Sequence, residues 1–193
     1  MSKARIIEAV TTLDVKTASA LLDAKPSLLT VVNRQGRNLL HLACAASPAK
    51  LRVPDARAVR MVQFLLDRGA SVKATPGGGL FAAGWWNDTK NLDLLLEAGA
   101  PIDVVVGITP FLAAWCWKRF DAAKLLARRG ANVDFQDQKG RTALHHGIEK
   151  EFDPALLNWL VKHGASPDIE DGSGVSARLK ASRKRDKHFA AAL

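Results

Sequence analysis

Cysteine is scarce in this sequence: the 193 residues include only Cys44 and Cys116. Two thiols cannot build a disulfide framework, so we expect a reducing compartment and a cytoplasmic protein. We also expect both thiols to be buried or half-buried small apolar residues rather than reactive groups. Apolar runs are short, and none approaches the ~18 residues of a membrane-spanning helix. The first residues lack the apolar run and cleavage site of a secretory signal, so no cleaved signal is expected.

Signatures of catalysis and cofactor binding are missing as well. The sequence has no G-x-x-x-x-G-K-[ST], H-E-x-x-H or G-x-S-x-G pattern. Residues 77–82 and 172–177 both satisfy G-x-G-x-x-A, but neither lies in the strand–helix–strand unit that dinucleotide binding requires. His145 and His146 are adjacent, yet no third ligand follows at a spacing suited to zinc. We therefore predict no enzyme, no cofactor and no metal site.

What the sequence does contain is an internal repeat. A Gly-Ala dipeptide recurs at intervals of 30, 31 and 34 residues, and an apolar triplet precedes each copy. This pattern is typical of a helix that ends at a glycine in the left-handed conformation. Helix starts are marked by Asn38, Thr109 and Thr142, which are natural N-caps, and by Pro110 at an early helical position. The four dipeptides are Gly69-Ala70, Gly99-Ala100, Gly130-Ala131 and Gly164-Ala165.

This pattern resembles the ankyrin repeat, G-x-T-P-L-H-x-A-A followed by a second helix that ends in L-L and G-A. The best matches start at Gly140-Arg-Thr-Ala-Leu-His145 and Gly107-Ile-Thr-Pro-Phe-Leu112. The resemblance implies an all-α, ankyrin-type helix-turn-helix repeat solenoid with short β-hairpin fingers. We expect one domain, 1–193, with an N-terminal cap at 1–32, repeats at 33–73, 74–103, 104–134 and 135–168, and a C-terminal half-repeat cap at 169–193.

The first of these repeats is about ten residues longer than the third. The extra residues fall at 47–55, where Pro48 and Pro54 favour an extended inserted loop. The second repeat departs from the pattern at its start, where Gly78, Gly79 and Phe81 replace the expected Thr, Pro and His. Residues 3–24 form two amphipathic stretches suited to a cap.

The resemblance also implies a function, since ankyrin proteins bind partner proteins in a concave groove. Fingers and the exposed ends of the first helices form this groove. Exposed tryptophan is typical of binding hot spots, although the rings could instead pack between helices or beneath the inserted loop. The candidate partner-binding residues are Trp85, Trp86, Cys116, Trp117, Glu149 and Lys150 on first helices, and Arg34, Arg37, Val105, Lys139 and Arg141 on fingers.

Other residues of these types have structural interpretations. We predict that Trp115 packs against a neighbouring repeat, and that Trp159 belongs to the core because it aligns with Phe64, Leu94 and Leu125. Three successive valines, 104–106, favour a short strand. His41 and His145 occupy the family's histidine position, where the ring is expected to bridge neighbouring turns by hydrogen bonds.

The formal net charge is +9, and basic residues are concentrated at 178–187. This segment could contact nucleic acid or an anionic surface. We favour instead a solvated capping helix with Leu179 and Phe189 packed inward, because a charge run without a groove or platform does not read nucleic acid. The basic fingers suggest an acidic partner, although exposed Lys and Arg usually serve solubility. We predict a monomer that binds another protein, with no nucleic-acid partner.

Overall fold

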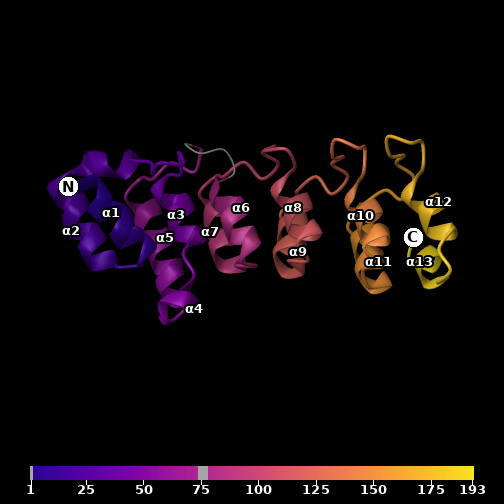
Figure 1. Ribbon diagram of the computed structural model, residues 1–193, viewed down its shortest axis with the longest axis horizontal. Helices are drawn as coiled ribbons and strands as arrows, with labels where there is room; N and C mark the ends of the chain where they lie inside the picture. The colour runs from indigo at the N-terminus through magenta and orange to yellow at the C-terminus, as the bar shows by residue number, and fades with distance from the viewer. Residues whose placement is uncertain (1, 74–77) are drawn as a thin grey trace. The chain divides into compact units, whose positions relative to one another are not determined.

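The computed structural model describes residues 2–73 and 78–193, which divide into two compact units, Met1–Val104 and Val105–Leu193. Helices follow one another in side-by-side pairs within each unit (Figure 1). No helix of the described residues is long and apolar enough to cross a membrane. The first four residues of the predicted 74–103 repeat, and the start of the Gly-rich stretch 77–82, lie outside the described part of the chain.

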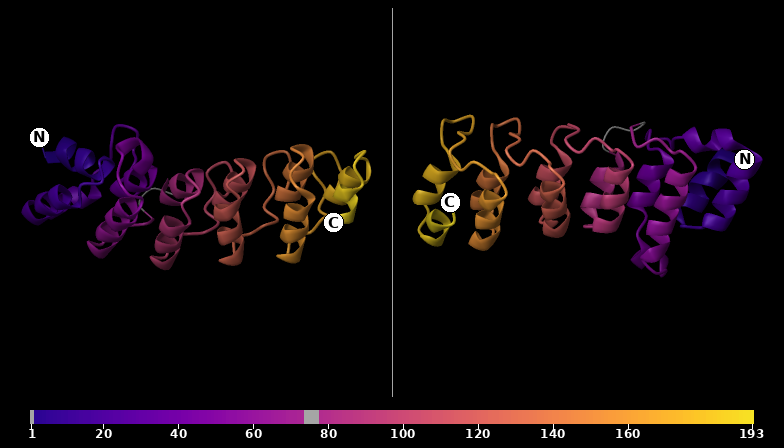
Figure 2. Two further views of the ribbon diagram at one scale, coloured as in Figure 1. Left: turned by 90° about the horizontal axis from the view of Figure 1, so that it is seen from below. Right: turned by 180° about the vertical axis from the view of Figure 1, so that it is seen from behind.

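The first unit begins with a helix pair, as the amphipathic stretches predict. Its neighbours follow in the same arrangement, with α3 packed against α5 and α6 (Figures 1 and 2). The elements are α1 (Ser2–Thr11), α2 (Val15–Ala24), the 3₁₀ helix η1 (Pro26–Thr30), α3 (Leu39–Ala45), α4 (Pro48–Leu51), α5 (Ala56–Asp67), α6 (Gly78–Trp85) and α7 (Thr89–Glu97).

The second unit repeats the pairing, with α10 packed against α8, α11 and α12. Its last segment forms two short helices rather than the single capping helix we predicted. The first of these helices ends at Ser182, and the second begins at His188 after the N-cap residue Lys187. The elements are α8 (Pro110–Cys116), α9 (Phe120–Arg128), α10 (Ala143–Glu149), α11 (Pro154–Lys162), α12 (Ala177–Ser182) and α13 (His188–Ala191).

The predicted helix ends are confirmed. Asn38 accepts a hydrogen bond from the backbone N–H of His41 at 2.8 Å, and Thr109 accepts one from Leu112 at 3.3 Å. Thr142 and His145 form a reciprocal capping box. The glycines of the four Gly-Ala dipeptides all have φ between 82° and 99°, the region that a side chain disfavours.

Each second helix buries a leucine in the core of its own unit, and Trp159 does not belong to this set. Leu65, Leu95, Leu126 and Leu160 are all buried. Trp159 precedes Leu160 by one residue and is half-buried, with its ring stacked on His163 at 3.7 Å between centroids. Our prediction of a core Trp159 is wrong, because one helical step turns a side chain by ~100° away from the core.

Trp115 packs as predicted. Its side chain is 0% exposed, and its indole N–H donates to the carbonyl of Ala143 at 2.8 Å. Phe120 and Phe152 meet the ring edge-on, with centroids at 5.6 and 5.7 Å. This cluster ties α8 to the helix pair that follows it. Cys44 is buried and Cys116 half-buried, also as expected.

The inserted segment 47–55 differs from the extended loop we predicted. Pro48–Leu51 forms the short helix α4, because Ser47 accepts a hydrogen bond from the backbone of Lys50 and Pro48 fits the first helical turn. Arg52 ends the helix in the left-handed conformation, with φ 54°. Figure 1 shows α4 extending beyond the ends of α6 and α7, on the side away from the fingers.

The fingers contain isolated β-bridges, and no strand is present in the parts of the chain that the structure describes. Val106 pairs only with Ile108, so the predicted strand at the three valines is wrong. Two of these side chains, Val105 and Val106, are more than half exposed. A single bridge in a tight turn leaves no partner strand against which they could pack.

Candidate functional site

The first helices end in a pair of positions whose side chains change from repeat to repeat. In the first unit these positions hold Ala45 and Ala46 on α3, and Trp85 and Trp86 on α6. Trp85 is 45% exposed and Trp86 43% exposed. Among the described residues of this unit they are the large aromatic side chains that are exposed.

Trp86 is also tied to the preceding repeat. Its indole N–H donates to the carbonyl of Ala45 at 3.2 Å, and the ammonium of Lys50 lies 5.9 Å from the ring centroid. This carbonyl belongs to the last turn of α3, where helical carbonyls lack partners within the helix. The ring therefore has one fixed edge and one exposed face. It combines the two interpretations that the sequence left open, packing against a neighbouring helix and exposure for a partner.

The second unit uses the equivalent positions in another way. They hold Cys116 and Trp117 at the end of α8, which are half-buried, and Glu149 and Lys150 at the end of α10, which are exposed. The ammonium of Lys150 donates to the carbonyl of Cys116 at 2.9 Å. Cys116 aligns with Ala45 and Lys150 with Trp86, so both units cap the same carbonyl from the same position of the next repeat.

Glu149 is held by two cations. Its carboxylate accepts from Arg141 Nη1 at 3.1 Å and from Lys180 Nζ at 2.5 Å. Partial burial acts to raise the pKa of Glu149, but the hydrogen bond from Lys180 and the charges of both cations outweigh it and lower the pKa. Glu149 is therefore ionised at neutral pH and engaged within its own unit.

Asp137 organises the finger beside it. Its carboxylate accepts from the side chain of Arg141 at 2.8 Å and from Nε2 of His146 at 3.0 Å, as well as from the backbone of Lys139 and Arg141. Burial opposes ionisation, yet these donors lower the pKa of Asp137 well below its usual range. The pKa of His146 is lowered by burial and by Arg141. Arg141 is consequently a structural group, whereas Lys139 is exposed.

Finger turns share a motif that our reading of the sequence missed. Asn33, Asp137 and Asp171 each stand three residues before a glycine, and each accepts from the backbone N–H groups two and four residues later. This is an Asx turn, and the recurring spacing could have revealed it. The finger at 104–107 has Val104 in that position. Arg34 and Arg37 extend from the first finger as exposed side chains.

The family's histidine position has two different outcomes. His145 bridges as expected: Nδ1 bonds with Thr142, and Nε2 with the carbonyl of Val175 at 3.0 Å. His41 differs at one ring nitrogen, since its buried Nδ1 has no hydrogen-bond partner in the described residues. Asn38 stands where Thr142 stands in the later repeat, so the hydroxyl that bonds to Nδ1 of His145 has no counterpart beside His41.

Three of the six basic residues in the segment 178–187 are paired with carboxylates. Arg178 pairs with Asp168 at 2.7 Å, and Lys180 pairs with Asp171 at 3.2 Å besides Glu149. Lys184 pairs with Glu151 at 2.9 Å. Phe189 packs inward as predicted, but Leu179 is 41% exposed, so that part of the prediction is wrong. Ser176 caps α12 by accepting a hydrogen bond from the backbone of Leu179 at 3.2 Å.

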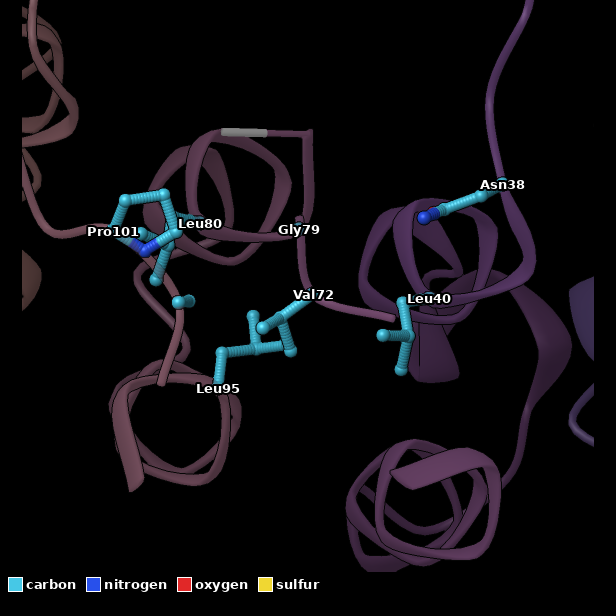
Figure 3. A pocket seen from close by; sticks show the side chains of 8 residues that line it. Asn38, Leu40, Val72, Gly79, Leu80, Leu95 and Pro101 are labelled. Atoms are coloured by element: carbon cyan, nitrogen blue, oxygen red, sulfur yellow. The ribbon is translucent and has the colours of Figure 1, made fainter. Parts of the chain in front are cut away.

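The cavities in the described residues differ in size, and their volumes decide whether a ligand could fit. The cavity in Figure 3, between Leu40, Val72 and Leu95, has a volume of about 10 Å³, room for a water molecule at most. A cleft of about 380 Å³ lies beside Trp86 in the first unit. Another, of about 330 Å³, lies in the second unit between the finger that contains Val106 and Ile108 and the finger that contains Lys139.

No set of three or more His, Cys, Asp or Glu side chains in the described residues is arranged to hold a metal ion. Burial raises the pKa of the Cys44 and Cys116 thiols, so neither is activated as a nucleophile.

Comparison with known proteins gives one consistent result. A family model described as ankyrin repeats, three copies, matches residues 80–171. The chain is 41% identical over 58 residues to the ADP-ribosylation factor GTPase-activating protein AGD2 of Arabidopsis thaliana, which covers 30% of this chain and 7% of that protein. It is 30% identical over 150 residues to the B-cell lymphoma 3 protein homolog of Mus musculus, covering 72% of this chain and 31% of that protein.

A solved structure extends this similarity along the chain. The crystal structure of an ankyrin repeat protein matches with a TM-score of 0.78 and 22% identity, over 97% of this chain and 95% of that one. The chain thus spans under a third of each curated relative named above, but nearly the whole of the solved structure. At this level of identity the structural match defines the fold.

Proposed function

Because this chain is an ankyrin-repeat protein, we propose that it is a non-catalytic interaction module that binds a partner protein. First-helix ends and fingers supply the contact surface. The observation that carries the proposal is the pair Trp85 and Trp86, which lie next to each other and remain 45% and 43% exposed. Tryptophan is strongly enriched among residues that dominate binding energy, and exposed pairs are rare on monomers.

The rings suit binding for a second reason. Trp86 is fixed by its bond to the Ala45 carbonyl, so little side-chain entropy remains to be lost when a partner covers it. Lys50, whose ammonium lies 5.9 Å from the Trp86 ring centroid, adds a charge at the edge of this surface. An aromatic centre with a charged edge is the usual anatomy of a protein interface.

Nucleic-acid binding through residues 178–187 has weaker support. Arg178, Lys180 and Lys184 each have a carboxylate partner, and a paired cation releases fewer counterions on binding phosphate. An anionic ligand at these three side chains would have to displace Asp168, Glu149 and Glu151, which leaves Arg183, Arg185 and Lys187 as the exposed cations without an ion pair in the described residues. Capture that collapses with modest salt and survives loss of both tryptophans would favour this alternative.

Affinity capture tests the proposal with a matched control. The intact chain and a Trp85→Ala/Trp86→Ala variant are used as baits in native lysate, beside Leu179→Ala, which removes another apolar side chain of similar exposure. We expect at least one protein to be retained by the intact chain and by Leu179→Ala and lost from the double variant. Identical sets from all three baits would contradict the proposal.

A further inference from the structure

We propose that the cleft between the inserted helix α4 and the start of α7, with Trp86 as its wall, binds an acidic segment of the partner that carries one apolar side chain. This inference rests on the proposed function and names the chemistry of the partner. It concerns a site that the inserted segment creates, away from the fingers.

The cleft is large enough to select a ligand. Its volume is about 380 Å³, within the range of sites that bind small ligands or a few side chains. Ser47 and Pro48 on one side and Trp86 and Lys90 on the other contribute to its lining. The residues from 47 to 55 are an insertion relative to the third repeat. The third repeat therefore has no segment that could form the same wall.

The apolar part of the lining fits a single anchor. Ala46, Pro48, Ala49 and Val59 face the cleft together with Trp86. Because the Ala45 carbonyl holds the indole, the wall is already formed before a ligand arrives. Preformed pockets of this kind bind with a smaller loss of side-chain entropy.

The charges around the cleft favour an acidic ligand. Two carboxylates are present, Asp55 and Asp88, and both are N-cap residues of the helices α5 and α7, where the helix dipole offsets negative charge. Asp88 is further occupied by Asn91, which donates to its two oxygens at 3.0 and 2.7 Å. Asp55 makes no side-chain capping bond, so the dipole of α5 is what offsets its charge.

The cations beside the cleft lack such compensation. Lys50 approaches the Trp86 ring, and Lys90 lines the cleft in the first turn of α7, the end of a helix at which a cation is not favoured. Within the described residues neither ammonium forms an ion pair with a carboxylate, in contrast to Lys180 and Lys184. A carboxylate on a ligand would supply the missing partner to both.

The cleft also has room for chain on either side of the anchor. Val59 and Lys90 line a second, more open cleft of about 530 Å³ together with Val15, Arg60 and Phe64. The two clefts therefore meet along α5. A segment of several residues can follow this path, with its acidic side chains near Lys50, Lys90 and Arg60 and its apolar side chain against Trp86.

Peptide display tests this assignment without knowledge of the natural partner. Random 12-residue peptides are selected on the intact chain, and enriched sequences are synthesised for fluorescence anisotropy. We expect an apolar residue flanked by Asp or Glu in the enriched set. Binding should fall about 10-fold or more in Lys50→Glu/Lys90→Glu and less in Lys50→Gln/Lys90→Gln, but not at all in Lys3→Glu/Arg5→Glu, which reverses two exposed cations of α1.

Three results would overturn the assignment. They are enriched peptides without acidic residues, no enrichment at all, and peptides whose binding is lost in Lys3→Glu/Arg5→Glu but kept in Lys50→Glu/Lys90→Glu. Thermal melts of each variant exclude simple unfolding. In the last case, capture that still depends on Trp85 and Trp86 would leave the proposed function standing, so the two failures are distinguishable.

Discussion

The two units of this protein treat equivalent surface positions differently. In the second unit, Arg141, Glu149 and Lys180 at and around the end of α10 are bonded to one another or to neighbouring fingers. In the first unit, the same region presents partly exposed Trp85 and Trp86 beside Lys50, which has no carboxylate partner in the described residues. A repeat thus supplies positions, and the side chains placed there decide whether a position serves stability or binding.

The irregular repeat is where this difference arises. The insertion that forms α4 adds a wall next to Trp86, and it breaks the regularity that the later repeats keep. In the later repeats the polar side chains bond to one another, and Asp137, Glu149 and Asp171 each accept a hydrogen bond from a cation of the same unit. Four substitutions probe this contrast. In the second unit the polar side chains pair with one another, whereas the first unit exposes side chains that could contact a partner.

The largest effect is expected from Trp115→Ala in the second unit. The change removes a fully buried ring, its contacts with Phe120 and Phe152, and its hydrogen bond to Ala143. We expect the free energy of unfolding to fall by about 3–5 kcal/mol. Urea denaturation followed by circular dichroism measures this, and a loss below about 1 kcal/mol would show that the cluster does not hold the unit together.

Asp137→Ala should come next. It leaves Arg141, His146 and two finger N–H groups without their acceptor, and we expect a loss of about 1–3 kcal/mol at neutral pH. The folded-state pKa of Asp137 lies below its unfolded value, so its contribution is complete above about pH 4 and is lost as the pH falls through the folded pKa. The difference from the intact chain should therefore narrow in acid.

Urea titrations at a series of pH values from neutral to acidic check this prediction, with Asp153→Ala as a control. Asp153 also accepts a backbone hydrogen bond, but it joins no ion pair in the described residues. A stability difference for Asp137→Ala that stays constant down to pH 2 would contradict the assigned role of the carboxylate.

Much of the fold follows from local chemistry, which the sequence displays directly. Gly130 and Thr142 mark a helix end and a helix start because each acts on backbone groups within a few residues. Trp159 shows the limit of such reasoning. An apolar triplet indicates a buried face but not which of three neighbours points to it, and the structure assigns that place to Leu160.

The candidate site was harder to predict, because it depends on residues far apart in the chain. The segment 178–187 is the most basic run in the sequence, yet its lysines meet carboxylates more than 30 positions away, such as Glu149 and Glu151. In the same way, nothing local indicates that the Ala45 carbonyl would receive the indole of Trp86. Charge and exposure are properties of neighbours in space.

Trp86→Ala should affect stability modestly and binding strongly. The substitution removes one hydrogen bond and part of a half-exposed ring, so we expect a loss of about 1 kcal/mol in the free energy of unfolding. Differential scanning calorimetry measures it beside Trp115→Ala. A loss as large as that of Trp115→Ala would mean that Trp86 is a packing residue and would remove the contrast between the units.

The smallest effect is expected from Arg178→Ala at the C-terminal end. Its ion pair with Asp168 is exposed on both sides, and such pairs contribute little to stability because water and salt screen them. We expect the melting temperature to change little and the change to shrink in 0.5 M salt. A large, salt-independent loss would show that the terminal helix pair depends on this contact.

The most direct test of the central claim is site-specific photocrosslinking. A photoreactive phenylalanine analogue replaces Trp85 in one variant and Leu179 in another, two side chains of similar exposure in different units. After irradiation in native lysate, we predict a discrete covalent adduct with a partner protein from position 85 and none from position 179. Adducts from position 179 alone, or from neither position, would contradict the claim that the tryptophan surface of the first unit binds a partner.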